Sequence, residues 1–212
     1  RIVVATGSSP AVPPRWRAAL GTRLVVNDDV FDWPTLPESV AVVGSGVIGL
    51  ELAQALHRLG VRVRLYGRGA RLGPLSDPAL QDVARRVFAD ELALTLDALH
   101  FEPRLEHGRV HVESRCRDGS THDEAFDVLL AATGRRANVD DLGLENTSLP
   151  LDPGGIPVWD RRSGQIGNSR VFLAGDAGEE RPLLHEAADD GRIAGDNAGR
   201  FPDVRVRPRR AP

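Results

Sequence analysis

Three glycines at fixed spacing form the feature of this sequence with the clearest chemical meaning, in the run Gly44-Ser45-Gly46-Val47-Ile48-Gly49. In such a G-x-G-x-x-G turn, the first glycine makes the tight turn and the second lets a pyrophosphate approach the backbone. The third lets the following helix lie close to the sheet. The start of that helix presents free N–H groups and a positive dipole end to the phosphates. The pattern predicts a dinucleotide-binding site.

The elements needed to position this turn surround it in the right order. Val40, Val42 and Val43 are β-branched and form a short apolar run that is typical of a strand buried on both faces. Leucines and alanines then recur at helical spacing as far as residue 59, Gly60 is a natural helix stop, and residues 61–65 alternate as a second strand. The alternative is a glycine-rich turn that only serves packing. The complete strand–turn–helix–strand unit favours nucleotide binding.

The end of the second strand indicates which dinucleotide binds. NAD sites usually carry an acidic residue there, which holds the ribose 2′-OH. This chain has Gly67 instead, followed by Arg68 and, further on, Arg71. Without the carboxylate a 2′-phosphate meets no repulsion, and a guanidinium group can hold that phosphate at two points. The residues favour NADP. NAD stays an alternative because Gly49 is typical of NAD sites, and solvated surface charge is the other interpretation of the two arginines.

An apolar strand ending in Ala-Thr-Gly occurs twice, at residues 5–7 and at residues 132–134. Small residues at a strand end let a ligand or a second chain approach the backbone. A single such tripeptide is mostly no more than a strand end. Because the two copies bracket the dinucleotide unit, we expect them to mark where the chain enters and leaves an inserted domain.

The rest of the chain predicts a helix, an antiparallel excursion and a final strand and helix. Residues 11–37 are rich in proline and polar residues and are interpreted as a wandering connection. The expected helices run from Asp77 to about Leu92 and from Leu183 to Ala198, and the expected strands cover residues 92–101, 109–117, 124–132 and 170–178. An antiparallel excursion is a common way for a nucleotide-binding domain to finish.

Composition excludes several classes of protein. The 212 residues carry a formal net charge of −3, which argues against a dedicated nucleic-acid or membrane-surface protein. No apolar run is long enough to predict a transmembrane helix. Every basic residue is arginine, so a P-loop lysine and a lysine nucleophile are excluded. The six histidines lack the cysteine or carboxylate neighbours of a metal site, and no metal is expected.

Two further features concern the chain's context. The one cysteine, Cys116, cannot form an internal disulfide, and it fits a reducing, cytoplasmic location. The sequence contains no methionine, and Arg1 leads directly into an apolar strand. We therefore expect the chain to be a piece of a longer protein.

Four segments in this order, ATGSSP, LPESVAVVGSGVIGLELAQAL, AATGRRAN and VFLAGDA, resemble the flavin-dependent pyridine nucleotide-disulfide oxidoreductases, and most of all the dihydrolipoamide dehydrogenases. The resemblance covers essentially the whole chain. It implies an α/β, Rossmann-like FAD/NAD(P)-binding fold, with a parallel sheet, helices on one side and an antiparallel β-meander, inserted between two segments of a partial FAD domain. The expected parts are a first FAD-domain segment and connection, the NAD(P)-binding domain and a returning FAD-domain segment, at residues 1–33, 34–138 and 139–212.

The resemblance also implies roles for individual residues. Those expected to bind NAD or NADP are Gly44, Ser45, Gly46, Val47, Ile48, Gly49, Glu51, Gly67, Arg68, Arg71, Thr133 and Gly134. Those expected to bind FAD are Thr6, Gly7, Gly175, Asp176, Leu184, His185 and Ala187.

Three of these residues have a plainer interpretation as well. Asp176 matches the aspartate that binds the ribityl chain of FAD, and a cap for the following helix is the alternative. Glu51 matches the glutamate that approaches flavin and nicotinamide, and an exposed glutamate stabilised by the helix N-terminus is the alternative. His185 does not match the family's catalytic histidine and is interpreted as a packing or cap residue.

The sequence lacks the parts of the family pattern that carry the reacting groups. The first glycine fingerprint, the Cys-x4-Cys redox pair and the C-terminal interface domain with its His-Glu base are missing from this sequence. We therefore assign no catalytic residue here. We expect the chain to bind nicotinamide nucleotide, to hold FAD poorly and to turn over nothing by itself. The full-length protein is expected to form a homodimer through the missing domain.

The resemblance implies hydride transfer between a nicotinamide and FAD, and electron transfer between FAD and a disulfide or dithiol, with dihydrolipoamide as the favoured substrate. A relative that lacks the dithiol and only exchanges hydride, as a transhydrogenase does, is an alternative. A non-catalytic module that senses a dinucleotide is another, against which Gly175-Asp176 argues.

Overall fold

The computed structural model of the chain describes residues 1–178 and 183–207. The chain divides into two compact units. We call Pro10–Gly134 the central unit, and Arg1–Ser9 together with Arg135–Pro212 the outer unit.

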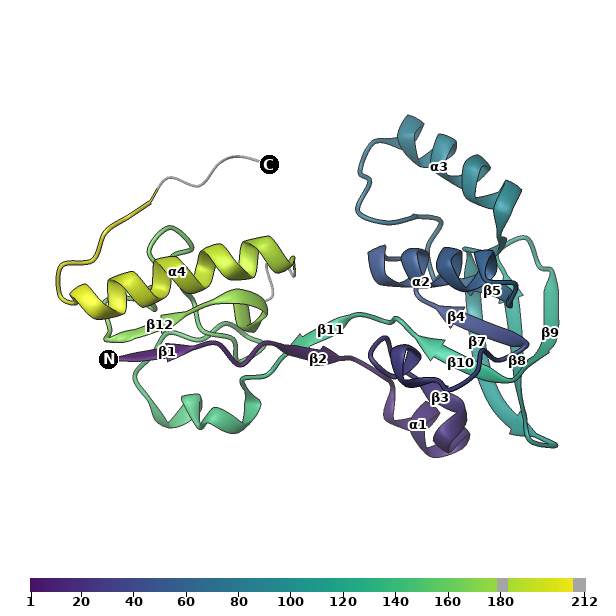
Figure 1. Ribbon diagram of the computed structural model, residues 1–212, viewed down its shortest axis with the longest axis horizontal. Coiled ribbons are helices and arrows are strands. Elements are labelled where there is room, and N and C mark those ends of the chain that lie inside the picture. Colours follow the sequence, from purple (N-terminus) through teal and green to yellow (C-terminus); the bar gives the residue numbers. More distant parts are fainter. Residues whose placement is uncertain (179–182, 208–212) are drawn as a thin grey trace. The chain divides into compact units, whose positions relative to one another are not determined.

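The central unit, described throughout, is built on a parallel sheet of five strands in the order β3-β10-β4-β5-β6. These strands are β3 (Leu24–Val25), β4 (Ser39–Val43), β5 (Arg62–Tyr66), β6 (Ala93–Thr95) and β10 (Val128–Ala131). Helices α2 (Val47–Arg58) and α3 (Pro78–Glu91) cover one face. The other face packs against α1 (Pro14–Leu20) and an antiparallel meander of β7 (Ala98–Glu106), β8 (Arg109–Cys116) and β9 (Thr121–Phe126). Figure 1 shows α2 and the meander on opposite sides of β4.

Strand β4 explains this layering. Val40 and Val42 point to the helix-side core, whereas Ala41 and Val43 belong to the meander-side core, because successive side chains of a strand face opposite sides. The whole strand is buried, which confirms the strand predicted from the apolar run. A parallel sheet covered by helices on one side and a meander on the other confirms the predicted fold class.

The outer unit contains two short strand pairs and one long helix. Strand β1 (Ile2–Val4) runs parallel to β12 (Val171–Leu173), and β2 (Ser8–Pro10) pairs with β11 (Arg135–Ala137). Helix α4 (Leu184–Arg200) packs on β12, where its alanines 194 and 198 meet Phe172. Short 3-10 turns occupy Asp140–Leu142, Leu144–Asn146 and Gly175–Gly178, and two others lie in the central unit at Gly21–Arg23 and Asp29–Asp32.

The structure corrects the interpretation of residues 11–37 as a wandering connection. Pro14 opens helix α1, a position that suits proline because its missing N–H has no helical partner there. Trp16 and Leu20, one helical turn apart, are buried against the meander-side core. Residues 10–33 therefore pack in the central unit, whereas the sequence grouped them with the FAD-domain segment.

Two expected strands are each divided between two sheets. Residues 92–101 supply β6 to the parallel sheet and the start of β7 to the meander. Residues 124–132 supply the end of β9 and then β10, with Asp127 between them. An uninterrupted apolar-rich run conceals such a change of sheet, because both halves have the composition of strands.

Asp127 fixes the register of β10 beside β4. Its carboxylate oxygen Oδ2 accepts hydrogen bonds from the backbone N and from Oγ of Ser39, at 2.9 and 3.0 Å. Ser39 Oγ in turn accepts the N–H of Asp127 at 3.1 Å. Ser39 is only 1% exposed, so water cannot replace these bonds.

Replacing Asp127 by alanine should lower the free energy of unfolding by about 2 kcal/mol, because it leaves buried donors of Ser39 without their acceptor. Urea denaturation followed by circular dichroism measures the change. Glu113→Ala is the control, because Glu113 contributes an exposed ion pair with Arg104 at 3.7 Å, and loss of it should cost at most about 0.5 kcal/mol. Equal midpoints for both variants would contradict this role of Asp127.

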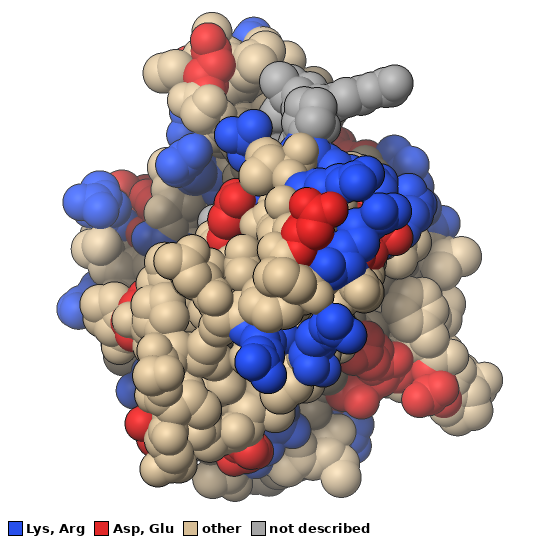
Figure 2. Space-filling model, turned by 90° about the vertical axis from the view of Figure 1, so that its left-hand side faces the viewer, with Lys and Arg blue, Asp and Glu red and all other residues tan. Residues whose placement is uncertain are grey.

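Surface charge is mixed in sign on the face shown in Figure 2, where basic and acidic side chains lie close to one another. Described ion pairs of the outer unit include Arg136–Asp140 at 2.8 Å and Arg192–Asp189 at 2.9 Å. Such exposed pairs contribute little to stability. None of the helices in the described ranges combines the length and apolar character needed to cross a bilayer. Residues 1–178 and 183–207 also contain no group of three or more potential metal ligands.

Candidate functional site

Two of the three turn glycines are required by close backbone packing at the carboxyl end of β4. A Cβ atom on Gly44, which has φ of 121°, would lie 2.0 Å from the carbonyl oxygen of Ala132. A Cβ atom on Gly49 would lie 1.8 Å from the carbonyl oxygen of Gly44 and 3.3 Å from Cβ of Ala132. The start of α2, the turn and the residue after β10 therefore approach one another more closely than side chains permit.

Gly46 differs from its two neighbours because nothing in the fold requires a glycine there. A Cβ atom on Gly46 would meet no atom within 4 Å, and its φ of −75° suits any residue. Gly46 is the N-cap of α2 and supplies no side-chain cap. The N–H groups of Val47, Ile48 and Gly49 lie in the first helical turn, where no intrahelical acceptor exists. This open helix N-terminus, bare of side chain, fits a pyrophosphate.

Ser45 ties the glycine turn to residues 67–77, which we call the β5–α3 loop. Its Oγ donates to the carbonyl oxygen of Arg71 at 2.8 Å, and its own carbonyl oxygen accepts the N–H of Gly73 at 2.8 Å. A Cβ atom on Gly67 would lie 2.9 Å from Ser45 Oγ. A larger residue at 67, including the acidic residue of many NAD sites, therefore requires Ser45 to move.

The two arginines of the β5–α3 loop are exposed but differ in their contacts. The guanidinium of Arg71 donates through Nη2 to the carbonyl oxygen of Leu75 at 2.9 Å, which uses one of its five N–H groups. Arg68 comes directly after Gly67, whose N–H and carbonyl oxygen bond to Thr95 and Ala98. Arg68 is thus an exposed cation attached to an anchored strand end.

The other residues assigned to the dinucleotide lie on the same unit. Glu51 is an exposed residue of α2. Thr133 donates its hydroxyl to the carbonyl oxygen of Ala11, and the carbonyl oxygen of Gly134 accepts the N–H of Ala11 at 2.9 Å. The described bonds of Thr133 and Gly134 thus hold the entry and the exit of the central unit together. Their contact with a dinucleotide stays a prediction.

At the end of β5, Tyr66 connects the sheet to the turn. Its carbonyl oxygen accepts the N–H of Gly44 at 2.8 Å. Burial of the hydroxyl, and secondarily the nearby charge of Glu124, raises the pKa of Tyr66 above its ordinary value. The side chain is therefore neutral at physiological pH and acts in packing, with its ring 5.2 Å from that of Phe101.

In the outer unit, Asp176 lies in a chain of side-chain hydrogen bonds. Its Oδ2 accepts from Ser8 Oγ at 2.9 Å, and Ser8 Oγ accepts from Arg135 Nε at 2.7 Å. Gly175, with φ of 67°, donates its N–H to Oδ2 of the buried Asp190 at 3.2 Å. Ser8, Arg135 and Asp190 were not among the predicted site residues. The first two lie inside the quoted segments ATGSSP and AATGRRAN, so their position in those motifs was the available signal.

The Ala-Thr-Gly copy of the outer unit is held by Asn138. Its backbone N–H donates to the carbonyl oxygen of Gly7 at 2.9 Å, and its Nδ2 donates to that of Thr6 at 3.0 Å. Gly7 has φ of 69°, a conformation that favours glycine. Thr6, Gly7 and Asp176 thus lie on segments braced by Asn138 and Ser8.

Residues at the start of α4 bear on the alternatives for Asp176 and His185. The N-cap of α4 is Leu183, and among residues 1–178 and 183–207 no side-chain hydrogen bond caps the helix. Asp176 and His185 are therefore not its caps, and the exposed His185 is not a packing residue. Leu184 is 90% exposed. A Cβ atom on Gly175 would lie 3.2 Å from that of Ala187, so the helix approaches the turn at this point.

Comparison with known proteins decides the family. A model of the family described as pyridine nucleotide-disulphide oxidoreductase matches residues 1–191. The chain belongs to the pyridine nucleotide-disulphide oxidoreductase family. This confirms the resemblance drawn from the four sequence segments. FAD and NAD or NADP are the cofactors of this family.

Relatives within this oxidoreductase family have several activities. Dihydrolipoyl dehydrogenase of Bacillus subtilis is 28% identical over 208 residues, covering 92% of this chain and 41% of the relative. Mercuric reductase of Shigella flexneri is 32% identical over 203 residues, covering 93% and 34%. The crystal structure of LpdA from Mycobacterium tuberculosis matches with a TM-score of 0.78 and 30% identity, covering 98% of this chain and 44% of LpdA. The chain thus spans less than half the length of these relatives.

Proposed function

We propose that this chain is the central part of an FAD-dependent oxidoreductase that binds NADP in preference to NAD and acts on a disulfide or dithiol. The central unit is the nucleotide-binding part of this proposal, and the outer unit contributes to the FAD site. Hydride exchange between nicotinamide and flavin is the chemistry that the two cofactors supply when bound. The protein's own part is to bind, orient and hold them.

The observation that carries the proposal is Gly46. Close packing accounts for Gly44 and Gly49, whereas Gly46 faces open space with an ordinary backbone conformation. A glycine that the fold does not need is expected where a ligand must reach the backbone. The N-terminus of α2, which Gly46 begins, offers N–H donors and a positive dipole end to a pyrophosphate.

NADP preference is proposed from Gly67 and Arg68. Gly67 places no carboxylate beside a ribose 2′-phosphate, and Ser45 fills the space that a side chain at 67 would need. Arg68 supplies an exposed guanidinium on the adjacent residue. A guanidinium group binds a phosphate through two parallel hydrogen bonds and cannot be neutralised at physiological pH.

Replacing Arg68 by alanine should raise the Kd for NADPH about tenfold and the Kd for NADH less than twofold, because only NADPH carries the 2′-phosphate. Titration of the chain with each dinucleotide, followed by nicotinamide fluorescence, measures both constants. Arg17→Ala removes an exposed arginine from α1 and serves as the control. Tighter binding of NADH than of NADPH to the unmodified chain would contradict the preference.

The FAD part of the proposal rests on Asp176, a half-buried carboxylate held by Ser8. Carboxylate oxygens accept hydrogen bonds, so Asp176 fits the hydroxyls of a ribityl chain. Thr6, Gly7, Gly175, Leu184, His185 and Ala187 complete the proposed set. Flavin absorbance in the full-length protein tests this part, since a colourless protein would contradict it.

The proposed substrate is dihydrolipoamide or another dithiol or disulfide. Support comes from the dihydrolipoyl dehydrogenase relative, while the mercuric reductase relative shows that the family includes other substrates. A Cys-x4-Cys pair encoded upstream of Arg1 would support dithiol chemistry, and its absence there would defeat it.

Cys116, which is buried and free, fits the reducing cytoplasm as the proposed location. Homodimerisation of the full-length enzyme is part of the same proposal.

A further inference from the structure

Gln81 is a buried amide in the first turn of α3 that binds the backbone of the β5–α3 loop. Its Oε1 accepts the N–H of Leu72 at 2.9 Å, and its Nε2 donates to the carbonyl oxygens of Leu72 and Leu75 at 2.9 and 2.8 Å. The residue is 5% exposed, although glutamine is mostly found at the surface. The amide thus pairs with Leu72 on both its acceptor and its donor side, as a neighbouring strand would.

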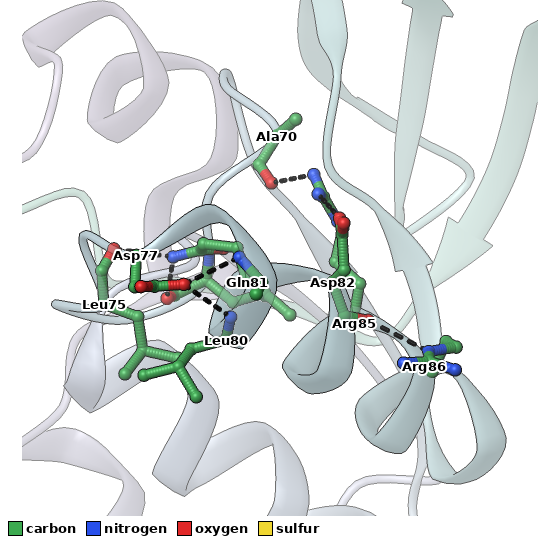
Figure 3. Close-up of polar contacts among 10 residues, drawn as sticks. Ala70, Leu75, Asp77, Leu80, Gln81, Asp82, Arg85 and Arg86 are labelled. Atoms are coloured by element: carbon green, nitrogen blue, oxygen red, sulfur yellow. Dashed lines mark hydrogen bonds and ion pairs between the residues drawn. The ribbon is translucent and has the colours of Figure 1, made fainter.

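Other side chains hold the same loop from two directions. Arg85 of α3 donates through Nη1 to the carbonyl oxygen of Ala70 at 2.9 Å, and Ser45 of the glycine turn donates to that of Arg71 at 2.8 Å. Figure 3 shows Gln81 among Leu75, Asp77 and Leu80, and Arg85 reaching toward Ala70. Asp77 caps α3 through hydrogen bonds from the N–H groups of Ala79 and Leu80, at 2.8 and 3.1 Å.

Hydrogen bonds from side chains, and not the backbone hydrogen bonds of a strand or helix, set the conformation of residues 70–75. The carbonyl oxygens of Ala70, Arg71, Leu72 and Leu75 each accept a hydrogen bond from a side chain. Leu72 also anchors the loop, because its side chain is 1% exposed and belongs to the helix-side core. Arg71 is carried by the segment that these contacts hold, and Arg68 lies two residues before the first of them at Ala70.

We propose that Gln81, assisted by Arg85, is a positioning residue that enables the chain to discriminate between NADP and NAD. This inference rests on the proposed function. Gln81 contacts neither the glycine turn nor the N-terminus of α2 in its described hydrogen bonds, so the pyrophosphate contacts do not depend on it directly. It holds the loop whose arginines are to meet the 2′-phosphate, and a pre-organised guanidinium loses less entropy on binding.

The test compares Gln81→Met, which keeps the side-chain length and removes the amide, with the unmodified chain. We expect the Kd for NADPH to rise about tenfold, as for the loss of one charge-assisted hydrogen bond, and the Kd for NADH to change less than twofold. Gln54→Met is the matched control, because the Gln54 amide donates to Glu91 Oε2 at 2.8 Å and does not bond to the loop. Arg85→Met, at a partly buried site, should shift the NADPH constant in the same direction.

A second measurement, made without any dinucleotide, reports how readily the β5–α3 loop is cleaved by a protease. Trypsin cleaves after arginine, and we expect faster cleavage after Arg68 and Arg71 in Gln81→Met than in Gln54→Met or the unmodified chain. Equal cleavage rates, or a parallel rise of both Kd values in Gln81→Met and in Arg85→Met, would overturn the inference alone. An unmodified chain that binds neither NADPH nor NADH would overturn the proposed function, and this inference with it.

Discussion

Replacing Gly46 by leucine should abolish binding of NADPH and NADH alike, with Kd values raised at least 100-fold, while the central unit stays folded. The leucine side chain would fill the open space in front of the N-terminus of α2, which nothing in the structure occupies within 4 Å of a Cβ atom. Loss of two hydrogen bonds from N–H groups to a charged pyrophosphate, each contributing about 1.5–3 kcal/mol, accounts for an effect of this size.

The same titration distinguishes a local block from general damage. Gly199→Leu adds an identical side chain to an exposed position of α4 with no atom within 4 Å of its Cβ, and it should bind both dinucleotides as the unmodified chain does. Circular dichroism and thermal unfolding should show that Gly46→Leu keeps its helices. If Gly46→Leu bound NADPH within twofold of the unmodified chain, the glycine turn would not be the binding site.

Replacing Gly49 by alanine should destabilise the fold itself, in contrast to Gly46→Leu, which should block binding and leave the fold intact. One methyl group at this position would lie 1.8 Å from the carbonyl oxygen of Gly44, so α2 must move away from the sheet. We expect the free energy of unfolding to fall by more than about 3 kcal/mol, the range of severe overpacking. Urea denaturation of the chain, followed by circular dichroism, measures the loss.

Gly46→Ala is the matched control for this prediction. It adds the same methyl group at the N-cap of α2, in open space. Alanine is a poorer N-cap than glycine, so its cost should stay at about 1 kcal/mol or below. If the two alanine variants were equally stable, the close approach of Gly49 to Gly44 would be refuted.

The sequence predicted the site's backbone well because glycine spacing and strand burial are local signals. The strand at 39–43, the helix after the turn and α3 starting at Asp77-Pro78 all depend on residues close in the chain. Distant packing was harder to predict. Helix α1 was missed because Pro13 and Pro14 resemble a loop until Trp16 and Leu20 are seen against the meander.

The same distinction applies to the residues around the site. Gly67, Arg68 and Arg71 were found from their place after the second strand. Gln81 was not, because a glutamine in a helix has the composition of an exposed residue, and only the folded loop brings Leu72 and Leu75 to its amide. Ala132 is a similar case, since its small size matters only because Gly44 and Gly49 approach it.

The hydrogen bonds that join Ala11 to Gly134 and to Thr133 have a consequence for how this architecture can change over time. The two points at which the chain enters and leaves the central unit are neighbours, so a different segment can lie between them without displacing the residues that lead to the outer unit. A homologous segment with different coenzyme selectivity could be grafted there without redesign of the host.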